Sequence, residues 1–410
     1  MTDIPAGWTL APLMEIVDLH DSRRVPLNQQ QRAGRQGPFP YYGANGQVDS
    51  INEYIFEGDY VLLAEDGGYF DDPARGVAYE VSGKFWVNNH AHVVSPRNGI
   101  PTRYLTYALN QLDWMPYVGG STRLKLTQEG MRRVRIPLAP PQVQLSIIAK
   151  LDTLLAPSRK AREELSRIPR LVERYKRAIL AAACSGDLTT DWRKERDLQE
   201  PTWAVLDTLL AVPIRNGLSI RGSDEPPGVR SLRLSALRTG VVDLDDIRYL
   251  PITEGKADKF LLCDGDVLVS RGNGTKSFVG IAAIVQRVTQ PTIFPDTAFR
   301  IRLATDRARA DWFTAIWNAP QVRTQIESAA KTTAGIWKVS QGDLARIQLL
   351  LPHVDEQDEI ARRTRAAFGR IETVAAETSR ATDFLDRLEK ATLGKAFRGE
   401  LVSSAMAGPQ

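Results

Sequence analysis

The stretch Ser185-Gly186-Asp187-Leu188 is followed 213 residues later by Arg398-Gly399-Glu400-Leu401, and the similarity extends outward from both places. At the same spacing, Ala178-Ile179-Leu180 matches Ala391-Thr392-Leu393, and Leu126-Thr127-Gln128 matches Val339-Ser340-Gln341. Self-similarity at a fixed long period indicates a duplicated structural unit. The sequence therefore predicts two copies of one unit, with no gaps in the later part of each copy.

Earlier in each copy the spacing changes. Gly58-Asp59-Tyr60 matches Gly265-Asp266-Val267 at 207 residues, and Trp8 is expected to match Trp203 at 195. Surface loops tolerate such insertions, whereas a gap-free segment is under a rigid geometric constraint. We therefore interpret each copy as a variable domain followed by an invariant spacer.

The gap-free spacer has the residue pattern of a long helix. Apolar or small residues recur at alternating steps of four and three, which keeps one stripe facing a partner helix. In the first copy the stripe is Ile147, Leu151, Leu154, Ser158, Ala161, Leu165, Ile168, Val172, Tyr175, Ile179 and Ala182. In the second it is Ile360, Thr364, Ala367, Ile371, Val374, Thr378, Ala381, Leu385 and Leu388. The partner of each stripe is expected to be the other stripe.

Prolines and glycines affect where the predicted helices begin, bend and end. Proline inside a helix removes a hydrogen bond and clashes with the preceding turn, so we expect a break or kink at Pro157 and Pro169. Pro157 is compatible with the start of a second helix, and Pro169 with a kink. A helix from about Ser158 to Ser185 would be roughly 40 Å long. Gly186 and Gly399 occupy positions that favour a left-handed helix cap.

The variable domains alternate short strands with glycine turns and short helices. Helical spacing marks Arg103–Leu112 and Asp311–Asn318, and β-rich runs such as Tyr60–Leu63 and Val267–Val269 lie between the turns. The expected fold class is α+β, with two repeated α/β domains separated and joined by two long antiparallel, coiled-coil-like helices in a pseudo-twofold arrangement. The expected boundaries are 1–140 and 191–352 for the variable domains, 141–190 and 353–402 for the spacer helices, and 403–410 for a tail.

Several loops combine glycine with side chains that can read DNA. Arginine and lysine reach guanine or phosphate, asparagine reaches adenine, aspartate accepts from cytosine, and glycine lets the backbone approach closely. In the first domain the candidate contacts are Tyr42, Gly43, Asn45, Asp66, Tyr69, Thr122, Arg123 and Lys125. In the second domain they are Arg271, Asn273, Lys276, Lys331, Thr333 and Lys338. Taken singly, each of these loops is also compatible with an ordinary turn.

The sequence lacks the usual signatures of catalysis. Gly274-Thr275-Lys276-Ser277 resembles the end of a phosphate-binding loop but has no glycine at the required earlier position. His90 and His92 have no nearby cysteine or histidine cluster that would complete a metal site. We therefore expect no catalytic residue, cofactor or metal in this chain, although the pair Glu65 and Asp66 leaves a nuclease centre open as an alternative.

The amino-acid composition limits which classes of protein the sequence is compatible with. The chain is 43% hydrophobic and 25% charged, with a formal net charge of +4, as is ordinary for a globular protein with a mild preference for anionic partners. It contains two cysteines, Cys184 and Cys263, without CxxC spacing, which fits a reducing compartment. Neither a membrane-spanning run nor an export signal is recognisable, so we expect a cytoplasmic protein with no membrane partner.

The combination of these features resembles the specificity subunit of type I restriction-modification enzymes over nearly the full chain. The opening Gly7-Trp8 and the loop Tyr42–Gly46 look like the start of that family's first target-recognition domain. The run Ile136–Gln144, with Ile147–Asp152 after it, is similar to the entry into its first conserved helix. Leu180–Leu188 and Lys395–Leu401 are similar to the ends of the two helices. The second copy departs from the pattern, since Pro352-His353 has one proline where Pro140-Pro141 has two.

The resemblance implies a function and a set of partners. Each target-recognition domain would dock in the major groove of double-stranded DNA on one half of a split, asymmetric target, and the helices would hold the domains apart. The subunit would gather two modification subunits, which methylate adenine with a methyl donor, and two restriction subunits, which use ATP to translocate and cut. Two alternatives remain: a self-sufficient nuclease or methyltransferase, and a scaffold whose repeated domains bind protein.

Overall fold

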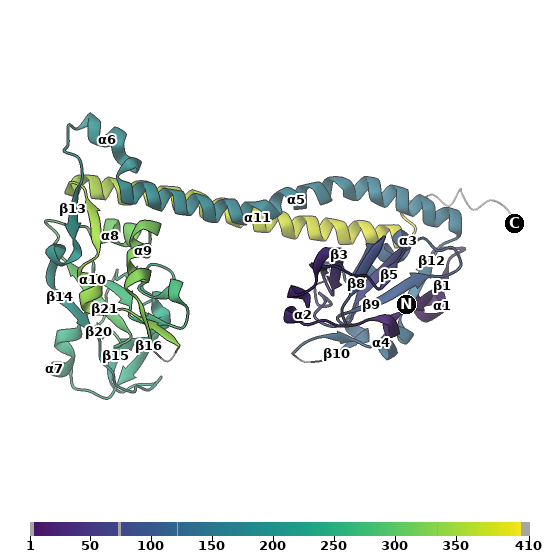
Figure 1. Cartoon of the computed structure of the whole chain (residues 1–410), viewed down its shortest axis with the longest axis horizontal. Coiled ribbons are helices and arrows are strands. Elements are labelled where there is room, and N and C mark those ends of the chain that lie inside the picture. Colours follow the sequence, from purple (N-terminus) through teal and green to yellow (C-terminus); the bar gives the residue numbers. More distant parts are fainter. Residues whose placement is uncertain (1–3, 73–74, 121, 334, 403–410) are drawn as a thin grey trace. The chain divides into compact units, whose positions relative to one another are not determined.

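The computed structural model describes residues 4–72, 75–120, 122–333 and 335–402 (Figure 1). The chain divides into two compact units: unit 1 is Met1–Arg167 with Glu377–Gln410, and unit 2 is Ile168–Ala376. The tail expected at 403–410 lies outside the described residues. Among the described helices, none is both long and apolar enough to cross a membrane.

Two long helices each contribute one part to both units: α5 (Pro141–Ser185) and α11 (Val354–Phe397) (Figure 1). In unit 1 the start of α5 packs with the end of α11, since Ile147 and Phe397 belong to one buried cluster. In unit 2 the end of α5 packs with the start of α11, since Cys184 and Ile360 belong to another. The two helices are therefore antiparallel, and the predicted fold class is confirmed.

Of the break or kink expected at Pro157 and Pro169, the break is wrong. Helix α5 begins at Pro141 and continues through both prolines to Ser185, so Pro157 does not start a second helix. Pro141 is the first helical residue, where a missing N–H costs nothing. Packing of the apolar face onto unit 1 and α11 outweighs the local cost of the two interior prolines, which is the usual relation of tertiary packing to helix propensity.

The predicted stripes follow the contact face only in part. Leu155 is 1% exposed whereas the predicted Leu154 is 50% exposed, and Tyr175 is 60% exposed. In the second stripe Ile360, Thr364 and Ile371 are buried, but Val374 and Leu388 are exposed. A straight helix drifts by about 20° per heptad from a strict seven-residue repeat, so a stripe drawn over many heptads leaves the contact face.

Unit 1 is built on two four-stranded sheets. In the order of pairing, the first consists of β2 (Val17–Leu19), β9 (Ala91–Pro96), β6 (Tyr60–Ala64) and β7 (Ala78–Val81). The second consists of β4 (Gly46–Ile51), β3 (Gln36–Gly43), β8 (Lys84–Val87) and β5 (Phe56–Glu57). Two antiparallel pairs complete it: β1 (Thr9–Pro12) with β12 (Arg135–Leu138), and β10 (Val118–Gly119) with β11 (Lys125–Leu126). The helices are α1 (Leu13–Ile16), α2 (Gln29–Ala33), α3 (Thr102–Asn110) and α4 (Gln128–Arg133).

Unit 2 contains the same kinds of sheet. In the order of pairing, these are β14 (Leu210–Asn216), β21 (Ala298–Leu303), β17 (Val267–Ser270) and β19 (Ala282–Ile284), and then β16 (Ile247–Leu250), β15 (Val229–Leu232) and β20 (Thr292–Ile293). Strand β13 (Thr202–Val205) pairs with β24 (Gln348–Leu351), and β23 (Ile336–Lys338) lies between β18 (Gly272–Asn273) and β22 (Lys331–Thr333). The helices are α6 (Thr190–Glu195), α7 (Glu254–Ala257), α8 (Ala310–Trp317), α9 (Pro320–Ala329) and α10 (Gln341–Ala345).

The two units share one topology. β2-β9-β6-β7 corresponds to β14-β21-β17-β19, with antiparallel neighbours throughout. β3 pairs antiparallel with β4 and parallel with β8, just as β15 does with β16 and β20. Helices α3 and α8 confirm the two short helices expected from spacing. The duplication inferred from the sequence is therefore present in the fold.

The repeat extends to single side chains at the helix starts. Gln144 and Gln357 are 4% and 0% exposed, and each side-chain amide donates to the carbonyl five residues earlier, at Ala139 and Pro352. Gly186 and Gly399 have φ of 79° and 75°, the left-handed conformation expected for them.

One expected match within the repeat is wrong. Thr9 pairs with Leu138, and Thr202 pairs with Leu351, so Thr202 is the counterpart of Thr9. Trp203 therefore corresponds to Leu10 rather than to Trp8. Its indole is 70% exposed, whereas that of Trp8 is 9% exposed and meets the ring of Phe397 edge-on. The shared tryptophan therefore does not mark one position in the repeat.

Candidate nucleic-acid interface

In unit 1 the three predicted loops meet. The Asn45 amide donates to the Gly67 carbonyl at 2.9 Å, which joins the turn between β3 and β4 to the loop after β6. An Arg123 guanidinium nitrogen lies 2.9 Å from an Asp66 carboxylate oxygen, which joins that loop to the β10–β11 hairpin. Arg123 and Lys125 are exposed, as is Thr122 at the tip of the same hairpin. Loops from distant parts of the sequence thus form one polar, basic surface.

Two predicted residues of this group have an inward role. Tyr42 is partly buried, and its ring packs against Tyr79 and Phe85. The Gly43 carbonyl accepts a hydrogen bond from the Tyr79 hydroxyl at 2.5 Å. Burial raises the pKa of Tyr79, so its hydroxyl stays a donor at neutral pH. Tyr42 and Gly43 therefore anchor the turn that presents Asn45. The predicted contact Tyr69 lies against a neighbouring cation, since the Arg75 guanidinium carbon is 4.5 Å from the centre of its ring.

Carboxylates behind the hairpin hold its basic side chains. Glu65 accepts from Lys125 Nζ at 3.1 Å and from Arg24 Nη1 at 2.7 Å. Asp66 also lies 2.5 Å from His90 Nδ1. The side chains of Lys125 and Arg123 are 50% and 59% exposed, whereas those of Glu65 and Asp66 are 14% and 18% exposed. The two cations are therefore accessible to a phosphate, while Arg24 and His90 stay beside the carboxylates.

His92 connects the same hairpin to the core of unit 1. Its ring is 2% exposed, with Nδ1 at 2.6 Å from Asp21 and Nε2 at 2.9 Å from the Leu126 carbonyl. Burial acts to raise the pKa of Asp21, but the hydrogen bond from His92 and the charge of Arg24 hold it below its usual value.

Asp21, Glu65 and His92 have potential metal-ligand atoms within 4.8 Å of one another. Arg24, however, contacts both carboxylates, at 3.2 Å and 2.7 Å. Arg24 and Lys125 thus supply the positive charges that face the two carboxylates. The expectation of a chain without metal or catalytic centre stays a prediction.

In unit 2 three predicted cations share a pocket of about 540 Å³. Arg271, Lys331 and Lys338 line it. The sequence reading missed two amides there, Asn216 and Gln341, whose side chains are joined by a 3.1 Å hydrogen bond. Gln341 lies in the repeated segment Val339-Ser340-Gln341, so its match to Gln128 was the only available signal.

The carboxylate of this pocket stays ionised. Burial acts to raise the pKa of Asp343, but hydrogen bonds from Ser340 and the charges of Lys331 and Arg346 lower it below its usual value. Ser340 and Asp343 also form a capping box that starts α10. The pocket therefore combines fixed amides and cations with one anion.

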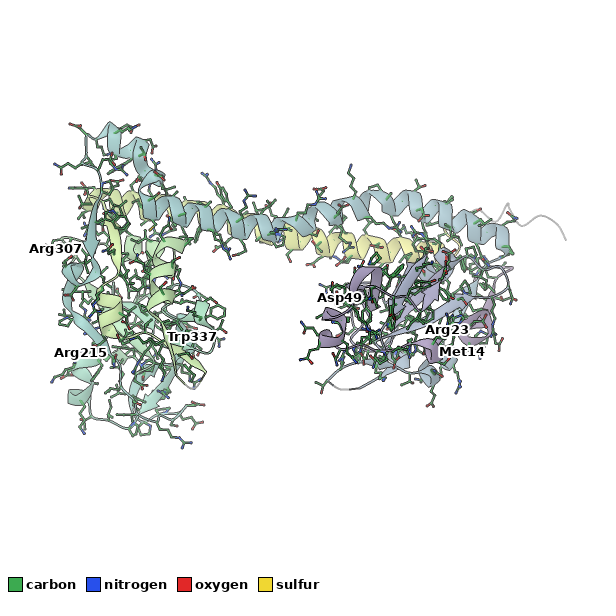
Figure 2. The ribbon with its side chains drawn as sticks, viewed as in Figure 1. Met14, Arg23, Asp49, Arg215, Arg307 and Trp337 are labelled. Carbon is green, nitrogen blue, oxygen red and sulfur yellow. The ribbon has the colours of Figure 1, made fainter. Side chains whose placement is uncertain are left out.

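Of the remaining predicted residues of unit 2, Lys276 and Asn273 lie next to Trp337, whose side chain is labelled in Figure 2. Lys276 Nζ is 4.8 Å from the centre of the Trp337 ring, and the backbone of Asn273 pairs with that of Trp337. Thr333 ends β22, but its side chain lies outside the described ones. The β18-β23-β22 sheet therefore joins the loop 271–276 to the hairpin 331–338, just as Asp66 pairs with Lys125 in unit 1.

Comparison with known proteins shows which family the first part of the chain matches and which proteins the chain is similar to. Residues 5–167 match the model of the type I restriction modification DNA specificity domain. The chain is 34% identical over 275 residues to the specificity subunit of the EcoKI type I restriction enzyme of Escherichia coli K12, covering 66% of this chain and 58% of that relative. It is 25% identical over 414 residues to the EcoDI specificity subunit of Escherichia coli, covering 98% of this chain and 90% of that relative.

The fold agrees with that match. A chain of a solved type I R-M system, studied for its complex assembly and conformational transition, superimposes with a TM-score of 0.64 at 16% identity, covering 97% of this chain and 99% of that one. The duplicated topology, the antiparallel helices and the sequence matches agree with one another. Residues 5–167 therefore match the type I restriction modification DNA specificity domain, and the chain as a whole is similar to type I restriction enzyme specificity subunits.

Proposed function

We propose that this chain is the sequence-specific DNA-binding subunit of a type I restriction-modification complex and that it reads a bipartite, asymmetric target. The observation that carries the proposal is the repetition of one arrangement. In each unit, a loop after the equivalent strand, β6 or β17, meets a hairpin carrying exposed lysines, β10–β11 or β22–β23. Two such surfaces with different side chains fit two different half-sites.

The side chains on these surfaces are those that DNA recognition uses. Arg123, Lys125, Lys331 and Lys338 can contact phosphate or guanine, and Asn45 can contact adenine. Helices α5 and α11 both contribute to both units, so their length is fixed within one chain. A helix of 45 residues extends for about 68 Å, which is about two turns of B-DNA at about 34 Å each. A fixed helical spacer suits a target of two parts.

We assign the chemistry to partner subunits. Two modification subunits would hold the methyl donor and methylate adenine, and two restriction subunits would bind ATP, translocate and cut. This chain would act without a cofactor, in the cytoplasm, as the recognition and assembly subunit. Its paired carboxylates are engaged by Arg24, Arg123 and Lys125, which favours a structural role for them over a nuclease role.

A domain exchange tests the proposal. Residues 1–140 are replaced by the first domain of the EcoKI relative, and methylated adenines are mapped in cells that also produce the modification subunit. We expect one half of the methylated sequence to change and the other half to stay as in the parent. A change in both halves, or in neither, contradicts modular reading.

A second experiment separates the alternatives. The purified chain is incubated alone with DNA, a divalent metal and a methyl donor, and then with the modification subunit added. We expect turnover only in the second mixture. Turnover by the chain alone would instead indicate a self-sufficient enzyme, and an absence of salt-sensitive DNA binding in either mixture would favour a protein scaffold.

A further inference from the structure

A segment of unit 2 that the sequence reading left unassigned occupies the place of a predicted contact loop. In unit 1 the turn presenting Asn45 joins β3 to β4. In unit 2 the equivalent strands, β15 and β16, are joined by residues 233–246. The equivalence rests on pairing, since both β3 and β15 have one antiparallel and one parallel neighbour. Residues 233–246 are therefore the structural counterpart of the turn between β3 and β4.

The neighbours of the two segments also correspond. In unit 1 the turn contacts the loop after β6, through Asn45 and Gly67. At the 207-residue spacing, Gly67 matches Gly274, next to Asn273 in the loop after β17. Leu234, Ser235, Leu237 and Arg238 of the segment 233–246 line a pocket of about 500 Å³ together with Ser270, Asn273, Phe278 and Ile281. The same two loops are thus adjacent in both units.

Two side chains of this pocket are available to a ligand. Arg238 is exposed, and within the described part of the chain its guanidinium has no ion-pair or hydrogen-bond partner. Arg233, in the same segment, contacts Asp224 and lies 3.9 Å from Asp246. Phe278 is 53% exposed beside the apolar wall formed by Leu234 and Ile281. A free cation and an exposed ring therefore flank Asn273.

We propose that Arg238 and Phe278, with the predicted contact Asn273 beside them, form a further DNA-contact element of unit 2. Arg238 would donate to an acceptor oxygen of the DNA, on guanine or on phosphate, and Phe278 would contact an apolar base edge such as the thymine methyl. This inference rests on the DNA recognition proposed above. It adds a recognition segment to the second half-site.

The test uses the full chain bound to its modification subunits and a duplex carrying the target found by methylation mapping. Arg238→Gln removes the charge and replaces the guanidinium by a shorter polar amide, and Arg307→Gln is the matched control. Arg307 is also exposed in unit 2, where it donates to the Thr208 carbonyl, and Figure 2 shows it on a different part of the unit from Trp337. Affinity is measured at several salt concentrations and on duplexes with single base-pair changes in the second half-site.

We expect Arg238→Gln to weaken binding roughly tenfold to hundredfold, and Arg307→Gln to leave it unchanged. Loss of discrimination at one base pair would assign the contact to guanine. Uniform weakening, with a salt slope reduced by about 1, would assign it to phosphate. Equal binding by Arg238→Gln and the parent on every duplex and at every salt concentration overturns the inference.

Phe278→Ala supplies an independent readout. We expect it to reduce discrimination for thymine at one position without changing the salt slope, because an apolar contact displaces no counterion. No change in either quantity removes Phe278 from the element. If Lys338→Ala weakens binding while both pocket variants do not, only this inference fails. If the complex binds every duplex alike, the proposed function itself fails.

Discussion

Burial gives the two cysteines of this chain different chemistry. Cys184 is 7% exposed in the core of unit 2, and burial raises the pKa of its thiol to about 11. Cys263 is exposed. Because the thiolate is the reactive form, we expect a disulfide reagent at pH 8 to modify Cys263 quickly and Cys184 only after unfolding in guanidinium. Cys263→Ser should abolish the fast reaction; a fast phase that persists in this variant contradicts the burial of Cys184.

An ion pair with little solvent access joins the start of α11 to the segment after α5. Arg193 is 4% exposed and contacts both Glu356, which is 0% exposed, and the carbonyl of Gly186. Glu200, which is exposed, also lies 2.6 Å from Arg193. We expect Glu356→Gln to lower the free energy of unfolding by up to about 3 kcal/mol, since it removes the buried partner of Arg193 and leaves the exposed Glu200 as its carboxylate partner. Denaturant titration measures the change.

The exposed pair of Glu164 and Arg167 provides the control for that loss. Glu164→Gln should change the free energy of unfolding by less than about 1 kcal/mol, because water screens the pair. Replacing both partners, as Arg193→Met with Glu356→Leu, should recover much of the loss. Equal losses for Glu356→Gln and Glu164→Gln would show that Glu200 alone compensates the charge of Arg193.

Among the elements, helix α5 contains an interior proline that should lower the stability of the protein. Pro169 is exposed inside a continuous helix, where a proline is less favourable than alanine by about 3 kcal/mol. We expect Pro169→Ala to raise the free energy of unfolding by up to about that amount, measured by thermal and denaturant unfolding. Pro141→Ala is the control, because Pro141 is the first helical residue and should be nearly neutral. A Pro169→Ala variant no more stable than the parent would imply that the proline is needed for packing.

The elements also show how far sequence reasoning reaches. Long helices and strands such as α11 and β6 follow from periodicity, which is a local signal. Continuity through Pro157 does not follow, because packing against other elements overrides local propensity. The choice of Leu155 over Leu154 as the buried residue likewise depends on helical drift against a partner, which no single stretch of sequence contains.

At the scale of the whole molecule, the duplication made the fold predictable from the sequence. Where the two copies differ in sequence, part of the candidate site was not predicted. The hairpin lysines were predicted because they lie in loops that also contain glycine, and the gap-free repeat places Lys125 opposite Lys338. The segment 233–246 was missed because its counterpart is a short turn with no similar residues, and only strand pairing relates the two. Loops diverge under different targets while the strands that carry them keep their register.

The aligned lysines give a prediction that depends on the duplication. Lys125 Nζ lies 3.1 Å from Glu65, whereas Lys338 is exposed and, within the described part of the chain, has no carboxylate at ion-pair distance. A lysine already partly neutralised by its own protein displaces fewer counterions when it meets a phosphate. We therefore expect Lys338→Ala to reduce the salt slope of DNA binding by about 1, and Lys125→Ala to reduce it by less.

The measurement is the DNA affinity of the complex between about 50 and 200 mM salt, the range over which phosphate contacts dominate its change. Both variants should weaken binding to all duplexes alike, since phosphate contacts carry no sequence information. Because the two lysines share no partner, the reduction in salt slope of the double variant should equal the sum of the reductions in the two single variants. Glu65→Gln tests the role of the carboxylate. If this variant makes the salt slope of DNA binding steeper than that of the parent, the Glu65 carboxylate partly neutralises Lys125. If it leaves the slope unchanged, and if Lys125→Ala and Lys338→Ala reduce the slope equally, the two hairpins contact DNA with equal charge.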